Sequence, residues 1–243
     1  MNAGSARRAQ PDRLGRAALA FFRARFRAEG DEERAAGAKA YLKSQLRFHG
    51  VPNPGIRAAV ADYLRSESLQ SASDVRAVCR ALYATDEHEL WSAAIAILEK
   101  RRKLLEPDDL PWLVELVRKS AGWAYVDWIA AKVIPAPLAK APKPAAVVAR
   151  WAKDEDFWVR RTALLCLLDD LRSGGGDFEL FERVAVPMLE EKEFFIRKAI
   201  GWVLREVSRK RPELVRGFIG RHRERMSGLS LREASKHLGL ARR

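Results

Sequence analysis

The segment 122–127, with the sequence GWAYVD, places a tryptophan and a carboxylate four residues apart. If this segment is helical, Trp123 and Asp127 project from the same face with their Cβ atoms about 5–6 Å apart. An aromatic face attracts cations through its π-electrons, and a carboxylate attracts them by its charge. The pair therefore suits a cationic target.

Asp127 lies at the edge of an apolar stripe. The stripe has the 3/4 spacing of a helix, includes Trp123, and continues through Val126, Ala130, Val133 and Ile134. A carboxylate in this position is partly desolvated and needs a counter-charge or hydrogen bonds. Two interpretations remain open: Asp127 pairs with an Arg or Lys and stabilises helix packing, or it is kept poised for chemistry.

Arg161 is the cation that most needs a specific anion. It lies in the segment 154–168 (DEDFWVRRTALLCLL), which is apolar nearly all round and predicts a central helix, and leucines flank it at i+3, i+4 and i+7. Asp127 or a nucleic-acid phosphate would serve as its partner. Arg160 is the solvated alternative, and the two roles can be exchanged as far as the sequence shows.

Trp202 lies between the apolar and basic sides of the segment 191–205 (EKEFFIRKAIGWVLR). On a helix it has Lys198 at i−4 and Arg205 at i+3. It is either a core tryptophan with an exposed edge or an aromatic plate inside a phosphate-binding surface.

Two further basic segments end or begin helices. In the first (YLKSQLRFHGVPNPGIR), Tyr41, Lys43 and Arg47 either contact phosphates or cap and solvate a turn. In the second (LSLREASKHL), Ser230 is an expected N-cap with an acidic residue three positions later, which is the spacing of a capping box. Its free N–H groups, with Arg232 and Lys236, would make a phosphate site, and the alternative is an ordinary capped terminal helix.

The elements that must position these side chains read almost entirely as helices. Proline and glycine mark the breaks, at Pro52 and Pro54, Pro107, the proline-rich linker 135–144 and the glycines at 174–176. The expected helices cover residues 11–28, 31–47, 55–66, 72–83, 87–103, 109–119, 123–134, 144–152, 157–171, 177–190, 194–209, 212–225 and 230–238.

An internal repeat supports a solenoid. Residues 154–168 align with residues 191–205 at an offset of 37, and both contain an acidic start, paired aromatics, a β-branched residue, two cations and an apolar run. A helical unit with this period is typical of HEAT-like repeats, which bury their apolar faces only by stacking. The fold class we predict is an all-α solenoid with a concave basic groove.

Composition limits the class of protein. The 243 residues are 48% hydrophobic and carry a net charge of +13, which indicates a polyanionic partner, nucleic acid before membrane. Cys79 and Cys166 lie in apolar helical patterns and read as reduced core residues of a cytoplasmic protein. We expect a disordered basic arm over residues 1–10 and a single domain over residues 11–243.

Several chemistries have no support in the sequence. GxxxxGK[ST], a GxGxxG after a strand, GxSxG and HExxH are all missing, and neither the four histidines nor the cysteines have metal-ligand spacing. No run of 18 apolar residues occurs. We therefore expect no metal, no cofactor and no membrane partner.

Four segments together resemble the DNA alkylation repair family of HEAT-like repeat DNA glycosylases, from about Tyr41 to the C-terminal LSLREASKHL. They are YLKSQLRFHGV, WAYVD, FWVRR and EFFIRKAIGWVLRE. The chain departs from the family at Ala124, where members often have a second acidic residue, and at Gly122, which is aromatic in some members. These departures concern the breadth of substrates.

The resemblance implies an enzyme that hydrolyses the N-glycosidic bond of cationic N3-alkyladenine or N7-alkylguanine in duplex DNA. It places the catalytic carboxylate at Asp127, the cleft tryptophans at Trp123 and Trp202, the DNA-contacting arginine at Arg161 and a cleft aromatic at Tyr41. It also implies a lesion held from its backbone side in an open groove, and we expect such a protein to act as a monomer on the nucleoid.

Two other functions are compatible with a basic helical repeat protein. One is a non-catalytic paralogue that recognises distorted or branched DNA, against which the retention of the aromatic and charged positions argues. The other is a scaffold for an acidic protein, which would not need a tryptophan beside a carboxylate. Release of a methylated base from duplex DNA distinguishes all three.

Overall fold

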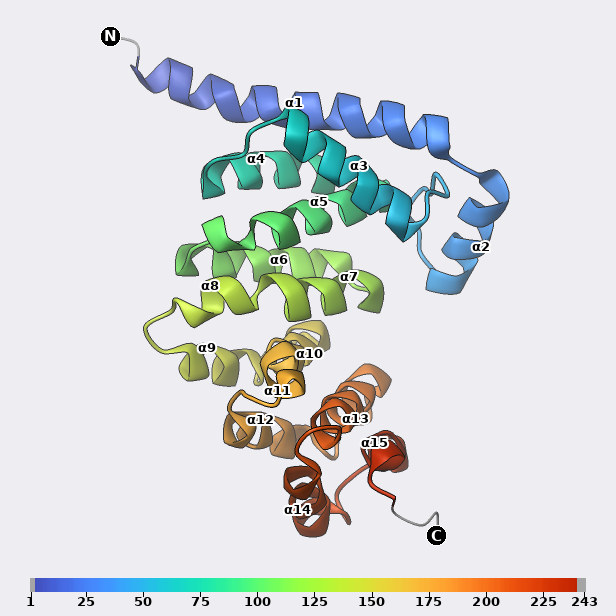
Figure 1. Ribbon diagram of the computed structural model, residues 1–243, viewed down its shortest axis with the longest axis vertical. Coiled ribbons are helices and arrows are strands. Elements are labelled where there is room, and N and C mark those ends of the chain that lie inside the picture. Colours follow the sequence, from blue (N-terminus) through green and yellow to red (C-terminus); the bar gives the residue numbers. More distant parts are fainter. Residues whose placement is uncertain (1–2, 240–243) are drawn as a thin grey trace. The chain divides into compact units, whose positions relative to one another are not determined.

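The structure is a computed structural model that describes the backbone of residues 3–239 and the side chains of residues 13–239 (Figure 1). No β-strand occurs among these residues; a single isolated bridge joins Arg47 and Glu87. The prediction of an all-α protein is confirmed. The chain divides into two compact units, residues 1–106 and 107–243.

The first unit contains five α-helices and a short 3-10 helix: α1 (Ala3–Glu29), α2 (Glu32–Leu42), α3 (Asn53–Ser66), α4 (Ala72–Tyr83), α5 (His88–Arg101) and η1 (Arg102–Leu104). Helix α1 packs along α4, and α5 contacts α1, α3 and α4 (Figure 1). The central position of α5 follows from its composition, because every residue from Leu90 to Leu98 is buried. α1 contributes a stripe at intervals of four residues: Leu14, Ala18, Phe22 and Phe26.

Helix α1 starts earlier than the sequence indicates. The arm expected over residues 1–10 is described as helical from Ala3 onward, while residues 1 and 2 lie outside the described part. Alanine, arginine and glutamine dominate this stretch and are good helix formers, so a basic composition does not imply disorder. The single domain over residues 11–243 stays a prediction.

The second unit contains the remaining elements. They are η2 (Pro107–Asp109), α6 (Leu110–Ser120), α7 (Trp123–Trp128), the π-helix η3 (Ile129–Val133), α8 (Pro135–Ala139), α9 (Pro144–Trp151), α10 (Phe157–Leu165), α11 (Leu168–Ser173), α12 (Phe178–Ala185), η4 (Val186–Met188), α13 (Phe194–Ser208), α14 (Pro212–His222), α15 (Gly228–Ala234) and η5 (Ser235–His237). α10 contacts α6, α7, α9, α12 and α13, as its apolar composition predicts.

The expected proline linker is partly helical. Pro135 stands at the first position of α8, where its missing N–H has no intrahelical partner to lose and its fixed φ suits a helix. Only the residues between α8 and α9 form a non-helical connection. Proline at a helix start was therefore mistaken for a break.

The 37-residue repeat is present in three dimensions. Helices α10 and α13 begin at Phe157 and Phe194, and the side chains of Asp156 and Glu193 cap them by accepting backbone N–H groups. Both pairs of positions differ by 37. The acidic start seen in the sequence is thus the N-cap of each unit.

A second feature repeats at the same offset. Arg160 donates from Nη1 to the carbonyl oxygen of Asp154 at 2.7 Å, and Arg197 donates from Nε to the carbonyl oxygen of Glu191 at 2.7 Å. The first of the two cations in each repeat therefore fastens the helix to the turn before it. The second cation in each repeat is free for another role.

Helices α13 and α15 lie against each other (Figure 1), and Gly201 of α13 is at their contact. A Cβ atom there would come within 2.6 Å of the Glu233 Cβ atom and 3.0 Å of the Ser230 carbonyl oxygen. We expect Gly201→Ala to lower the free energy of unfolding by about 1–3 kcal/mol, because two helix backbones must separate. Urea unfolding measures this.

Gly220→Ala is the matched control. Gly220 lies in α14, and a Cβ atom there meets no neighbour within 4 Å. The same substitution should leave stability unchanged or raise it by up to about 1 kcal/mol, because alanine is the better helix former. Equal effects at the two glycines would contradict close packing of α13 on α15.

Candidate functional site

Asp127 and Arg161 form a bidentate ion pair between α7 and α10. The Arg161 Nε atom donates to Oδ1 of Asp127 at 2.7 Å, and Nη2 donates to Oδ2 at 2.8 Å. The arginine side chain is 3% exposed and the aspartate side chain is 18% exposed. The aspartate side chain is therefore less deeply buried than the arginine that it pairs with.

The rest of the guanidinium is also engaged. Nη1 of Arg161 donates to the carbonyl oxygen of Phe195 on α13, and the guanidinium carbon lies 5.8 Å from the centre of the Phe195 ring. Arg161 thus connects α7, α10 and α13. Of the two anions that the sequence offered, the structure places Asp127 on this arginine.

Arg160 has a different set of partners. Its Nε and Nη2 atoms donate to the two carboxylate oxygens of Glu191 at 3.0 and 2.9 Å, and Nη1 donates to two backbone carbonyl oxygens. The side chain is only 20% exposed, so the expectation of a solvated arginine is wrong. Arg161, and not Arg160, is therefore the arginine that pairs with Asp127.

A π-helical turn follows Asp127 directly. The N–H of Ile134 donates to the carbonyl oxygen of Ile129 at 3.0 Å, a bond across five residues, and η3 spans Ile129–Val133. Lys132 in this turn pairs with Asp169 at 2.6 Å. Single π-turns are frequent at functional sites because they re-aim nearby side chains.

The aromatic residues of the second unit differ in exposure. Trp123 is 38% exposed at the start of α7, one turn before Asp127, and Trp202 is half-buried on α13. Trp202 follows Phe195 by seven residues, so it lies on the same face of α13 roughly 10 Å further along the axis. Phe194, which the sequence analysis did not single out, is 55% exposed beside Phe195.

Three of the cations expected to bind phosphates converge on one carboxylate. Lys198 and Lys236 donate to Oε1 of Glu233 at 3.0 and 2.8 Å, and Arg205 donates from Nη1 to Oε2. The Glu233 side chain is 8% exposed. Burial alone would raise the pKa of Glu233, but the hydrogen bonds from Lys236 and Lys198 outweigh it and lower the pKa to about 2.

The start of α15 differs from the expected capping box. Ser227 is the N-cap and accepts the N–H of Ser230 at 3.0 Å, while the Ser230 hydroxyl donates to the carbonyl oxygen of Arg197. The expectation that Ser230 caps the helix is wrong because an earlier serine takes that place. Glu233 faces α13 instead of the helix start, and Arg232 is exposed.

The candidate residues of the first unit lie where α2 ends. The helix stops at Lys43, which has a left-handed backbone (φ 50°), so the helix expected over residues 31–47 is shorter. Tyr41 is 73% exposed and Lys43 is exposed. Arg47 is 55% exposed, and its Nη2 atom pairs with Oε2 of Glu87 at 2.8 Å.

Glu87 is the buried anion of this segment. Its carboxylate is 1% exposed and also accepts from Arg23 and His49 at 2.8 and 2.7 Å. Burial would raise the pKa of Glu87, but hydrogen bonds from His49, Arg47 and Arg23 lower it to about 2. Glu87 has no motif or spacing in the sequence that predicts this role.

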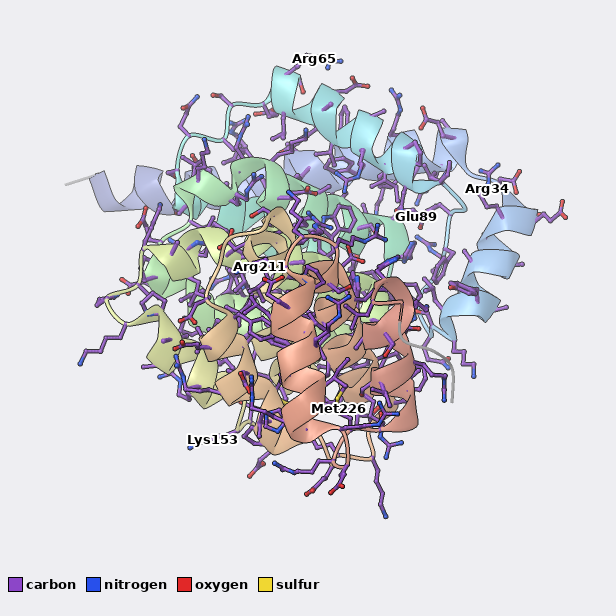
Figure 2. All side chains as sticks on the ribbon, turned by 60° about the horizontal axis from the view of Figure 1, so that its bottom comes forward. Arg34, Arg65, Glu89, Lys153, Arg211 and Met226 are labelled. Carbon is purple, nitrogen blue, oxygen red and sulfur yellow. The ribbon has the colours of Figure 1, made fainter. Side chains whose placement is uncertain are left out.

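Glu89 holds the backbone that follows Arg47. Its carboxylate accepts the N–H groups of His49, Gly50 and Val51 at 2.9, 2.8 and 3.3 Å (Glu89 is labelled in Figure 2). Gly50 has φ 81°, and a Cβ atom there would meet a backbone oxygen at 2.0 Å, so only glycine fits. Tyr41, Lys43 and Arg47 therefore precede a firmly held turn.

A scan of the described part of the chain finds no group of three or more His, Cys, Asp or Glu placed to hold a metal ion. Within the same part, no helix is long and apolar enough to span a membrane. Cys79 and Cys166 are free and buried, and burial raises the pKa of both thiols. Their expected role as core residues is confirmed.

The sequence profile of a family described as DNA alkylation repair enzyme matches residues 22–238. The chain belongs to the DNA alkylation repair enzyme family. This match includes every site residue expected from the sequence, from Tyr41 to Lys236. A search of curated proteins gives no match.

Solved structures related to this DNA alkylation repair protein share its fold. A predicted DNA alkylation repair enzyme from Enterococcus faecalis has a TM-score of 0.77 and 27% identity over 88% of this chain and 98% of that one. AlkD2 from Streptococcus mutans has a TM-score of 0.60 and 17% identity over 86% of this chain and 99% of that one. The protein smu.31 from Streptococcus mutans UA159 has a TM-score of 0.57 and 18% identity over 76% of this chain and 98% of that one.

These likenesses confirm the helical-repeat fold expected for the family. Membership in a DNA repair family also makes DNA the partner. The concave basic groove and the roles of the individual site residues stay predictions.

Proposed function

We propose that this protein is a monofunctional DNA glycosylase that excises cationic alkylated purines, N3-alkyladenine and N7-alkylguanine, from duplex DNA by hydrolysing the N-glycosidic bond. The observation that carries the proposal is the carboxylate of Asp127, which is fixed from behind by buried Arg161 and partly exposed beside Trp123. Membership in the DNA alkylation repair enzyme family supports a reaction on alkylated DNA.

The proposed reaction needs little acid catalysis. A purine alkylated at N3 or N7 is already cationic and leaves readily, so positive charge develops on the sugar as the glycosidic bond breaks. A nearby carboxylate stabilises this oxocarbenium-like sugar and orients the attacking water. Asp127 is the group we assign to both tasks.

The orientation of the ion pair decides whether it can act on a cation. An Arg–Asp pair is neutral overall, but here the arginine side chain is almost fully buried and the aspartate side chain is partly exposed. Each carboxylate oxygen has a second lone pair beyond the one that Arg161 occupies. A cation at the exposed side therefore meets the negative end of an aligned dipole, and its position is preset before the substrate binds.

The tryptophans supply a second attraction for the same cation. An exposed indole face attracts a cation by about 0.5–1 kcal/mol, and by about 2 kcal/mol when water is excluded. Trp123 precedes Asp127 by one helical turn, and Trp202 lies on the helix whose Phe195 carbonyl oxygen accepts from Arg161. Both are assigned here to the alkylated base or its sugar.

Binding to the duplex is assigned to phosphate contacts. The sequence predicts eight side chains for this role, Tyr41, Lys43, Arg47, Arg161, Lys198, Arg205, Arg232 and Lys236, and all of them except Arg161 are assigned here to phosphate contacts. Within this proposal Arg161 is a positioning residue, because its guanidinium already donates hydrogen bonds to Asp127 and to the carbonyl oxygen of Phe195. The others act through charge or, for Tyr41, through its exposed ring.

The test is release of free base from duplex DNA treated with a methylating agent, separated by chromatography. Release of N3-methyladenine or N7-methylguanine supports the proposal. Binding of the same DNA without release of either base would instead support the non-catalytic paralogue that recognises distorted or branched DNA.

A further inference from the structure

The cluster around Glu233 holds two lysine side chains in one place. The Nζ atoms of Lys198 and Lys236 lie 3.0 and 2.8 Å from the same oxygen, Oε1 of Glu233. The two ammonium groups are therefore no more than about 6 Å apart, and each has three N–H donors of which Glu233 uses one. Their side chains are 39% and 48% exposed, so the spare donors are accessible.

The cluster keeps an excess of positive charge. Arg205 pairs with the second oxygen of Glu233 and, through Nε, with Glu206 at 3.3 Å. Arg209 pairs with Glu206 at 3.5 Å. When Arg205, Arg209 and both lysines are set against Glu206 and Glu233, cations exceed carboxylates by two. A single phosphate charge is therefore attracted even while the internal ion pairs persist.

Helix packing fixes where this charge is presented. Lys198 precedes Trp202 by four residues on α13, and Gly201 brings α15 so close that the Glu233 Cβ atom would touch an added methyl group. Ser230 adds a hydrogen bond to the α13 backbone. Lys198 consequently lies one helical turn from Trp202, and Lys236, in η5 directly after α15, is held near Lys198 by the close packing of α15 on α13.

We propose that Lys198 and Lys236 form a clamp for one backbone phosphate of DNA, with Glu233 as the positioning residue that holds both ammonium groups. The clamp rests on the proposed function only in that the phosphate belongs to the DNA that the same site processes. Glu233 holds two otherwise flexible surface lysines in place before the phosphate arrives. Less side-chain entropy is therefore lost when the phosphate binds.

The test measures the salt dependence of binding to an undamaged DNA duplex, which requires no catalysis. Each phosphate contact contributes about 0.9 to the slope of log affinity against log salt and roughly eightfold to affinity at 0.1 M salt. In a clamp the phosphate is held only while both ammonium groups contact it, so loss of either lysine releases it. Lys198→Met, Lys236→Met and the double variant should therefore each lower the slope by about the same amount, about 0.9. A slope equal to that of the unaltered protein would overturn the clamp.

Lys210→Met is the matched control. Lys210 is an exposed lysine of the same unit whose Nζ donates to the carbonyl oxygen of Ser173 at 2.9 Å, away from any carboxylate of the cluster. The clamp predicts a smaller loss of slope for this variant than for either clamp lysine. Equal losses would show general charge attraction and would overturn the clamp.

A second measurement needs no variant. Reductive methylation of the unaltered protein, read by mass spectrometry, should be several-fold slower at Lys198 and Lys236 when duplex DNA is bound and little changed at Lys210. Equal reactivity with and without DNA would refute the clamp even if the protein excises methylated bases. Protection without excision would support the clamp and count against the proposed glycosylase.

Discussion

Asp127→Asn is expected to lower the rate of base release by roughly 100-fold or more, the scale of losing one preorganised electrostatic group. The substitution keeps the size of the side chain but removes the charge that stabilises the developing cation. Single-turnover release of N7-methylguanine and N3-methyladenine measures the effect. Release at the unaltered rate would show that this carboxylate is structural.

The same substitution has a predictable effect on binding and stability. The amide oxygen still accepts from Arg161, but the guanidinium loses its ionic partner, so melting temperature should fall and the assay must be run below it. DNA affinity should persist or rise because an anion has been neutralised. Asp169→Asn is the control, since Asp169 also pairs with cations in this unit and should leave base release unchanged.

Arg161→Met is expected to lower the free energy of unfolding by about 3–5 kcal/mol, because it leaves Asp127 without its counter-charge in a largely desolvated site. The Phe195 carbonyl oxygen also loses its donor. Partial exposure of Asp127 places the expected value toward the lower end of that range. Urea unfolding gives the cost.

Arg118→Met provides the comparison. Arg118 also makes a bidentate contact, from Nη1 and Nη2 to Asp154 at 2.8 and 2.6 Å, but its side chain is 43% exposed. An exposed pair of this kind contributes about 0.2–1 kcal/mol. Similar small losses for Arg118 and Arg161 would contradict the counter-charge role.

DNA affinity of the Arg161→Met variant separates the two assignments of this arginine. A large loss of stability with unchanged affinity would exclude a direct phosphate contact. Combining the substitution with Asp127→Asn should recover part of the lost stability, because the unpaired charge is then removed. Additive losses would show that the two side chains do not interact.

The sequence limits the partner of Arg161 to two anions, Asp127 or a phosphate, but it does not decide between them. Leucines on three neighbouring positions indicate that the arginine is buried, and a buried cation needs an anion. The choice between Asp127 and phosphate depends on how α7 packs against α10, which is set by tertiary contacts far apart in sequence. The 37-residue repeat can be predicted from the sequence because it consists of a local pattern of capping residues, aromatic residues and cations that recurs in the same order.

Glu233 shows why local rules mislead at the C-terminal end. A serine three residues before an acid satisfies the capping-box spacing, so Ser230 was chosen and Glu233 was given a local partner. Ser227 satisfies the cap equally well, and this frees Ser230 and Glu233 to face α13. The three cations that share Glu233 come from two segments far apart in sequence, Lys198 and Arg205 on α13 and Lys236 after α15, so local spacing does not reveal the shared counter-charge.

The π-turn at Ile129–Val133 has a consequence for comparing relatives of this protein. A π-turn accommodates one residue more than the corresponding turn of an α-helix. A relative with a regular helix here should be one residue shorter at this point. If an alignment puts that gap before Asp127 instead, it will match the relative's carboxylate to Trp128, and the relative will be misread as lacking its acid.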